Sequence, residues 1–230
     1  MKSGVATRPI ADLDAYKHKL NQSVFKSALL MRPVFESARA SSRRIIFAEG
    51  EDERVLRTAQ AVLEETTETP ILIGRPEVLE ARCERAGLTI RPGRDFDFVN
   101  PENDPRYFDY WTSYHALLQR QGVTPDIAKA IMRTNTTAIG AVAVQRGEAD
   151  CLICGTFGEY RWHLNYIEQI LGQSGNTAHG ALSLMILESG PLFIADTQVH
   201  ELPSPEQLAR IVEGAARHVR RFGMEPNIAL

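Results

Sequence analysis

The stretch Ile45-Ile-Phe-Ala-Glu-Gly-Glu-Asp-Glu-Arg-Val-Leu56 decides the fold, because it joins a buried strand to a helix with almost no loop. Residues 45–48 form a short, continuous apolar run, which is typical of a strand that is covered on both faces in a parallel sheet. Asp52 is the expected N-cap of the helix, whose apolar residues recur at helical spacing as far as Leu63. A strand that leads into such a helix is the first half of a βαβ unit.

The joint between this strand and helix allows two interpretations. A helix N-terminus offers free amides and a positive dipole end, so the joint could bind a phosphate. It contains a single glycine, however, and its acidic residues would repel a phosphate and compensate the helix dipole themselves. Those residues are Glu49, Glu51, Asp52 and Glu53. We favour a structural role for the joint, with phosphate binding as the alternative.

Strands and helices alternate along most of the remaining chain. We predict strands at 70–74, 150–155, 180–187 and 192–197, and helices at 12–31, 76–86, 107–120, 124–133, 138–146, 159–171 and 204–223. Residues 188–191 are expected to join the last two strands as a hairpin, residues 100–110 to form a surface loop, and residues 227–230 to open a further strand. This order of elements favours an α/β fold with a parallel sheet.

Composition and charge exclude several classes of protein. A net charge of -3 gives no electrostatic reason to expect a nucleic-acid partner. Residues 1–20 mix polar and apolar side chains, so we expect neither a secretory signal nor a membrane span. Three cysteines, an odd number, favour a reducing cytoplasm.

Cys151 and Cys154 have C-x-x-C spacing, but residues three apart on a strand point to opposite faces, so we favour two inert core thiols over a metal or redox site.

Few sequence motifs point to catalysis. The chain has no G-x-S-x-G sequence for a nucleophile and no H-E-x-x-H sequence for a metal. Its six histidines are scattered, and only His163 and His179 lie in segments that flank polar loops. We therefore assign no catalytic residue and expect no metal held by the protein.

A family resemblance extends over nearly the whole chain. The string Phe47 to Leu56 resembles the N-terminal signature of the phosphate acetyltransferase and butyryltransferase family. Gly147-Glu-Ala-Asp150, with the glycine at 155, and Phe193-Ile-Ala-Asp196, with the helix after it, are similar to later motifs of that family. Within this family, the residues of these motifs most resemble the phosphotransacetylase-like domain at the C-terminal end of bacterial hybrid NADP-dependent malic enzymes. Residues 3–10 resemble the segment that leads out of the malic-enzyme catalytic domain.

The resemblance implies a two-domain, three-layer α/β/α architecture with mostly parallel sheets. We divide the chain into a linker at 1–11, a first α/β domain at 12–148 and a second, incomplete one at 149–230. Family members move an acetyl group between phosphate and coenzyme A. In hybrid malic enzymes the corresponding domain is similar to a regulatory, oligomer-forming module that senses acetyl-CoA.

Several residues depart from the family pattern. Leu118-Gln119 stands where family members carry an Arg-Lys pair, and Gly158, Glu159 and Tyr160 stand where they show a His and a Ser/Thr run. Asn165 falls near a further family arginine, and the remaining catalytic Ser, Arg and Asp positions would follow residue 230. Each lost arginine removes charge-assisted hydrogen bonds to phosphate, worth about 1.5 to 3 kcal/mol apiece.

These departures favour a module that binds acetyl-CoA or CoA without turnover, and the alternative is an active phosphate acetyltransferase. We expect no tightly bound cofactor, a homo-oligomer, and a parent NADP-dependent, oxaloacetate-decarboxylating malic enzyme whose catalytic domain is a partner. The expected acetyl-CoA contacts lie near strand ends, although each could equally be a surface group around an ordinary loop. They are Arg133, Asn135, Thr136, Arg161 and His163.

Overall fold

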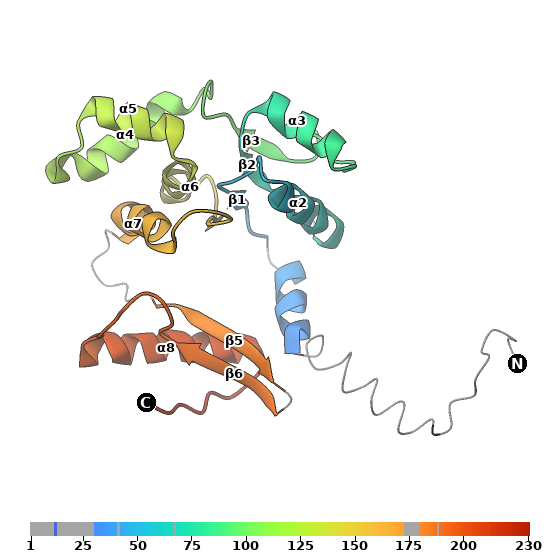
Figure 1. The fold of residues 1–230 in the computed structure, drawn as a ribbon, viewed down its shortest axis with the longest axis vertical. Helices are drawn as coiled ribbons and strands as arrows, with labels where there is room; N and C mark the ends of the chain where they lie inside the picture. Colours follow the sequence, from blue (N-terminus) through green and yellow to red (C-terminus); the bar gives the residue numbers. More distant parts are fainter. Residues whose placement is uncertain (1–11, 13–29, 41, 67, 173–179, 188) are drawn as a thin grey trace, which may run out of the picture. The chain divides into compact units, whose positions relative to one another are not determined.

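A computed structural model describes residues 12, 30–40, 42–66, 68–172, 180–187 and 189–230 (Figure 1). The chain divides into two compact units, one of residues 39–177 and one of residues 1–38 together with 178–230. Within the described residues, no helix combines the length and the apolar character that a bilayer span requires. The predicted linker at 1–11 and nearly all of the predicted helix at 12–31 lie outside the described residues, whereas residues 30–40 are helical.

The larger unit contains a parallel sheet of four short strands in the order β3-β2-β1-β4. These strands are β1 (Ile45–Phe47), β2 (Ile71–Ile73), β3 (Asp97–Val99) and β4 (Cys151–Ile153). Residues of β1 pair with both neighbours, Ile46 with Ile71 on β2 and with Leu152 on β4. The α/β class and the parallel sheet predicted from the sequence are therefore confirmed. Strand β3 was not predicted, because Asp-Phe-Val is a three-residue segment that begins with an exposed polar side chain.

Helices cover both faces of this sheet (Figure 1). Alternate residues of β1 point to opposite faces, so that Ile46 and Phe47 belong to two different apolar cores. The Phe47 core is closed by α2 (Glu53–Glu65) and α3 (Pro76–Arg85). The Ile46 core is closed by α4 (Tyr107–Leu118), α5 (Pro125–Thr134), α6 (Thr136–Gln145) and α7 (Tyr160–Leu171).

Most helix boundaries follow from capping residues that the sequence displays. Asp52 accepts a hydrogen bond from the amide of Arg54, and Thr124 accepts one from the amide of Ile127. Gly122 has a φ of 91° and follows the short 3-10 helix η1 (Gln119–Gln121) at the end of α4. Helix α6 begins two residues before the predicted start, because the Asn135 side chain accepts a hydrogen bond from the amide of Ala138 and caps it there.

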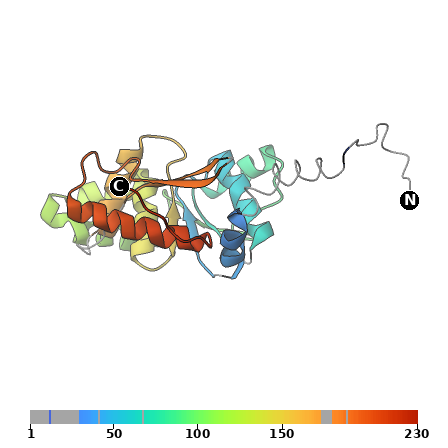
Figure 2. The ribbon, with the colours of Figure 1, turned by 90° about the horizontal axis from the view of Figure 1, so that it is seen from below.

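The smaller unit contains an antiparallel hairpin and a long helix. Strands β5 (Leu182–Leu187) and β6 (Gly190–Ala195) pair along their whole length and lie beside α8 (Pro205–Arg221), as Figure 2 also shows. The hairpin and the capping box at Ser204 are confirmed. Residues 227–230 form no strand, which corrects the prediction. They lie along the groove between β6 and α8 instead of pairing with a neighbouring strand.

The structure divides the chain at a different place from the predicted boundary at 148/149. Strand β4 follows that boundary, yet it pairs with β1 in the sheet of the larger unit. The Asp150 carboxylate also accepts hydrogen bonds from the amide and the guanidinium of Arg44, which directly precedes β1. Helix α7 then packs on α6, so the contacts of the larger unit continue to about residue 177.

Replacing Gly50 by alanine should destabilise the larger unit. An added Cβ would lie 2.7 Å from the Ile73 carbonyl oxygen and 2.9 Å from the Leu72 Cβ, so backbone must move to admit it. We expect Gly50→Ala to lower the free energy of unfolding by about 1 to 3 kcal/mol in chemical denaturation. Gly172→Ala is the matched control, since its Cβ would come no closer than 3.9 Å and its φ of -77° suits alanine. Equal stability of the two variants would contradict the close packing of β1 against β2.

Candidate functional site

A buried carboxylate lies at the carboxyl end of β1. Glu49 follows this strand directly and is only 7% exposed. One carboxylate oxygen accepts a hydrogen bond from the Gly155 amide at 3.0 Å, and the other accepts one from the Thr156 hydroxyl at 2.9 Å. Glu49 thus ties β1 to the connection between β4 and α7. Ligands of open parallel α/β sheets bind at this edge, beyond the carboxyl ends of the strands.

His163 lies beside this carboxylate in the first turn of α7 and is 6% exposed. Its Nε2 is 2.8 Å from the Phe157 carbonyl oxygen, and its Nδ1 is 2.8 Å from the Thr137 hydroxyl. A carbonyl can only accept, so Nε2 carries a hydrogen, and in the uncharged ring Nδ1 accepts from Thr137. Glu49 lies 4.0 Å from Nδ1. We call Glu49, Thr137, Thr156 and His163 the carboxyl-edge cluster.

The cysteines near this cluster are only partly as predicted. Burial and the charge of Glu49 raise the pKa of the Cys154 thiol to about 11, although a hydrogen bond with Thr137 opposes the shift. The thiol is therefore protonated at neutral pH and a poor nucleophile. Cys151 and Cys154 are both free, but Cys151 is exposed, which corrects its prediction as a core thiol. Cys151 and Ile153 share one face of β4 and both side chains are exposed, so this face is not covered.

The acidic joint after β1 is held by protein groups. The Glu51 carboxylate binds the amide and the guanidinium of Arg75, and Asp52 binds the guanidinium of Arg54. The hydrogen bond from Arg54 holds the pKa of Asp52 at about 2, against the opposing effect of burial. Since these carboxylates remain charged and face the helix N-terminus, the contacts favour the structural interpretation of the joint over phosphate binding.

The structure places the five predicted ligand residues in different settings. Asn135 is buried as the cap of α6, the helix that carries Thr137, and Thr136 is the first residue of that helix. His163 belongs to the carboxyl-edge cluster. Arg133 is exposed, stacks on the Tyr107 ring at 3.8 Å and donates to the Pro101 and Glu102 carbonyls. Arg161 is exposed on α7. Their role in binding a ligand stays a prediction.

Sequence reasoning missed three members of the cluster, Glu49, Thr137 and Thr156. Glu49 was considered only as a residue that repels phosphate, and Thr137 only as part of a break between helices. A usable signal existed for Glu49, because an acidic residue directly after a buried strand lies at the edge where ligands bind. Thr137 offered no such signal, since its contact with His163 joins residues 26 positions apart.

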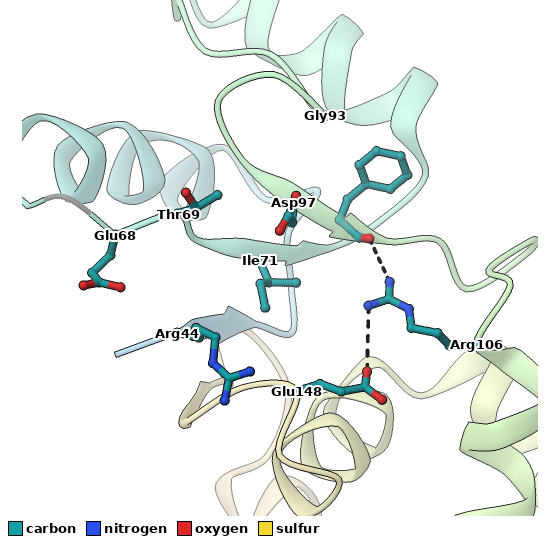
Figure 3. A pocket seen from close by; sticks show the side chains of 9 residues that line it. Arg44, Glu68, Thr69, Ile71, Gly93, Asp97, Arg106 and Glu148 are labelled. Atoms are coloured by element: carbon teal, nitrogen blue, oxygen red, sulfur yellow. Dashed lines mark hydrogen bonds and ion pairs between the residues drawn. The ribbon is translucent and has the colours of Figure 1, made fainter. Parts of the chain in front are cut away.

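A hollow of about 680 Å³ lies at the opposite edge of the sheet (Figure 3). Its lining includes Arg44 before β1, Thr69 before β2 and Asp97 at the start of β3, so it occupies the amino-terminal edge. Arg44 is paired with Asp150, and its guanidinium holds the pKa of that carboxyl below its usual value. Arg106 is paired with Asp104 and lies 3.8 Å from Glu148. Both arginines thus serve ion pairs within the protein.

No metal centre can be assigned within the described part of the chain. Groups of three or more His, Cys, Asp or Glu side chains that could hold a metal ion do not occur among those residues. The carboxyl-edge cluster offers one carboxylate, one imidazole and two hydroxyl groups.

Removing the Glu49 side chain should weaken the larger unit. Glu49→Ala leaves the Gly155 amide and the Thr156 hydroxyl without their acceptor, and hydrogen bonds to a charged group contribute about 1.5 to 3 kcal/mol each. We expect a loss of about 2 to 4 kcal/mol in chemical denaturation, and a smaller loss for Glu49→Gln, whose amide can bond both groups. Glu53→Ala, which removes an exposed pair with Arg57 and a charge from the first turn of α2, should stay within about 1 kcal/mol of the wild type. A Glu49→Ala protein as stable as this control would contradict the assigned contacts.

Comparison with known proteins identifies the relatives of this fold. The chain is 56% identical over its whole length to the NAD-dependent malic enzyme of Rhizobium meliloti and 49% identical to the NADP-dependent malic enzyme of Salmonella typhimurium. It spans 30% of the length of each of these enzymes. The EutD phosphotransacetylase from Staphylococcus aureus has the same fold, with a TM-score of 0.73 and 21% sequence identity. That match covers 87% of this chain and 59% of the other.

A family model supports the family resemblance that the motifs at 47–56, 147–155 and 193–196 indicate. The model of the phosphate acetyl/butaryl transferases matches residues 29–230, which include both the carboxyl-edge cluster and the hairpin. The resemblance proposed from the sequence is thereby confirmed, and the chain belongs to the phosphate acetyl/butaryl transferase family.

Proposed function

We propose that this chain is the phosphotransacetylase-like regulatory and oligomerisation module of a hybrid malic enzyme, and that it binds acetyl-CoA without transferring the acetyl group. The observation that carries the proposal is the closed hydrogen bonding of the carboxyl-edge cluster. Both Glu49 oxygens and both His163 ring nitrogens are bonded to groups of the protein itself.

A closed cluster is poorly suited to acyl transfer. A general base must reach the proton that it abstracts, and a phosphate site needs cations or amide donors directed at the anion. For His163 to act as a base, its bond with Thr137 would have to break, and for Glu49 to act, the connection at 155–156 would lose its anchor. Such bonds rigidify the edge of the sheet. They therefore support binding by a fixed surface over catalysis.

The departures from the family pattern support the same conclusion. Leu118, which stands where the family carries an arginine, is 1% exposed and packs in the Ile46 core. The Gln119 side chain donates to the Ala116 carbonyl. At the position where the family shows a histidine, an added Cβ on Gly158 would lie 3.1 Å from His163 Nε2. This position is filled by packing against His163, so a larger side chain would disturb the cluster.

The relatives support the parent protein that we propose. Malic enzymes match the chain from end to end and are more than three times as long. We expect a malic-enzyme catalytic domain in the same polypeptide, decarboxylation of oxaloacetate by that domain, and a cytoplasmic location. The names of the relatives include both NAD- and NADP-dependent enzymes, and we propose NADP for the parent as the sequence resemblance implies. Three free thiols agree with a reducing compartment.

The second candidate is a phosphate acetyltransferase that moves an acetyl group between phosphate and coenzyme A. It is favoured by the membership of the family and by the fold shared with a phosphotransacetylase. The two candidates differ in one measurable property, which is turnover.

We expect this chain to form no acetyl-CoA from acetyl phosphate and CoA above a buffer control. The measurement is the absorbance of the thioester bond at saturating substrates, with the Staphylococcus aureus phosphotransacetylase as the active control. Turnover that survives repeated purification and disappears in His163→Ala would overturn the proposal and establish the acetyltransferase.

Binding of acetyl-CoA should depend on the arginines predicted from the sequence. We expect Arg133→Ala and Arg161→Ala to weaken binding about tenfold each in titration calorimetry, because a lost charge-assisted contact of about 1.4 kcal/mol corresponds to that factor. Arg85→Ala, which removes an exposed arginine from the last turn of α3, is the control and should bind like the wild type. Unchanged affinity in both test variants would reject this site, and no binding by the wild type would reject the ligand.

A further inference from the structure

His163 is enclosed by three groups that differ in how they can use a hydrogen. Its Nε2 donates to the Phe157 carbonyl at 2.8 Å, and its Nδ1 lies 2.8 Å from the Thr137 hydroxyl. The Glu49 carboxylate lies 4.0 Å from Nδ1. The carbonyl and the carboxylate can only accept, whereas the hydroxyl can either donate or accept. Since His163 is only 6% exposed, the protein itself must satisfy each protonation state of the ring.

These partners suit the charged ring as well as the neutral one. A protonated imidazole donates from both nitrogens. The bond from Nε2 to Phe157 then stays, and the bond between Nδ1 and Thr137 reverses, because the hydroxyl oxygen can accept at the same 2.8 Å. The hydroxyl hydrogen can turn to the Cys154 sulfur, since Thr137 and Cys154 are hydrogen-bonded to each other. Protonation therefore moves hydrogens and requires no movement of heavy atoms.

The positive charge of the ring also has a partner. A buried charge without a partner is strongly unfavourable, and the buried Glu49 carboxylate supplies the opposite charge. The Glu49 oxygen that lies 4.0 Å from Nδ1 is the one that accepts from the Gly155 amide. The cluster thus carries one net negative charge while His163 is neutral, and no net charge once the ring is protonated.

The other titratable groups around the ring keep their charge state near neutral pH. Helix α6, which packs on α7, has no titratable side chain. Burial raises the pKa of the Cys154 thiol to about 11, and burial also raises the pKa of Tyr114 on α4 to about 12. Arg54 on α2 donates to the Thr156 carbonyl. The titratable side chains at the start of α7 are exposed to solvent, and they are Glu159, Tyr160 and Arg161. Imidazole is the side chain that ordinarily changes its charge between about pH 5 and 8.

From these observations we infer that His163 is a proton-dependent switch of the charge at the carboxyl edge of the sheet. Uptake of one proton from water reverses the hydrogen bond with Thr137 and cancels the negative charge of Glu49. Ligands of parallel α/β sheets bind at this edge, so an anionic ligand is repelled by the cluster with a neutral ring and is not repelled by the cluster with a charged ring. The identity of that anion as acetyl-CoA rests on the proposed function.

Nitrogen NMR of the chain with labelled histidine tests the proton step without any ligand, and His163→Gln assigns the signals. We expect the His163 ring to have a hydrogen on Nε2 alone at about pH 8 and on both nitrogens at about pH 5, in a folded protein. Glu49→Gln should need at least about ten times more protons for the same change, because it removes the charge partner. A wild-type ring that stays neutral until the protein unfolds would overturn the inference, as would an identical transition in Glu49→Gln.

Titration calorimetry with acetyl-CoA tests the effect on the ligand. We expect the wild type to bind more tightly at about pH 6 than at about pH 8, and this gain should be about threefold larger than in His163→Gln. The Gln side chain can bond both Phe157 and Thr137 but takes up no proton. The phosphates of the ligand titrate alike in both experiments and cancel from the comparison. Equal gains would overturn the effect on the ligand. Absence of binding by the wild type at both pH values would reject the proposed function instead, and the NMR titration would then decide on the switch by itself.

Discussion

The pairing of β1 with strands on both sides is the constraint on which the larger unit depends. Strand β1 has only three residues, yet it is hydrogen-bonded to β2 and β4 and contributes a side chain to the core on each face of the sheet. Its brevity requires a sharp exit, and Gly50 provides it by passing against the Ile73 carbonyl, where its own amide donates at 3.1 Å. The exit in turn places Glu49 at the edge of the sheet and starts α2 at Asp52. The position of one strand thus fixes a core on each face and the polar edge between them.

A carboxylate at this position must be satisfied by the protein. Burying an unpaired charge is strongly unfavourable, so Glu49 requires donors, and the connection at Gly155 and Thr156 supplies two. The same connection presents the Phe157 carbonyl to His163, whose other nitrogen reaches Thr137. The hydrogen bonds to Glu49 hold the connection after β4, and this connection places the Phe157 carbonyl next to His163. The hydrogen bonds of the cluster therefore support one another. A catalytic site usually leaves one such group available to the substrate, and on this ground we propose that the cluster acts as a rigid scaffold.

The sequence predicted those features of the fold that depend on neighbouring residues. Asp52, Thr124 and Ser204 revealed helix starts because a capping side chain bonds to amides two or three residues ahead. The sequence could not predict features that depend on partners far away along the chain. Strand β3 exists because Phe98 pairs with Leu72, and β4 belongs to the first sheet because Leu152 pairs with Ile46, about a hundred positions away. The same limit hid the site, since Glu49 meets Thr156 and Thr137 meets His163 only after the sheet has formed.

The two units differ in how completely their strands are covered, and the difference explains where sequence patterns succeed. Ile46 and Phe47 in β1 are apolar in succession, and the structure supplies a core for each. Leu184 and Met185 in β5 are likewise apolar in succession, but only the first faces a described element, α8. The described elements therefore cover both faces of β1, whereas among the described residues α8 covers one face of the hairpin. Since burial of apolar surface is what such a pattern encodes, it predicts the strand in both units, although it does not say which element will cover each face.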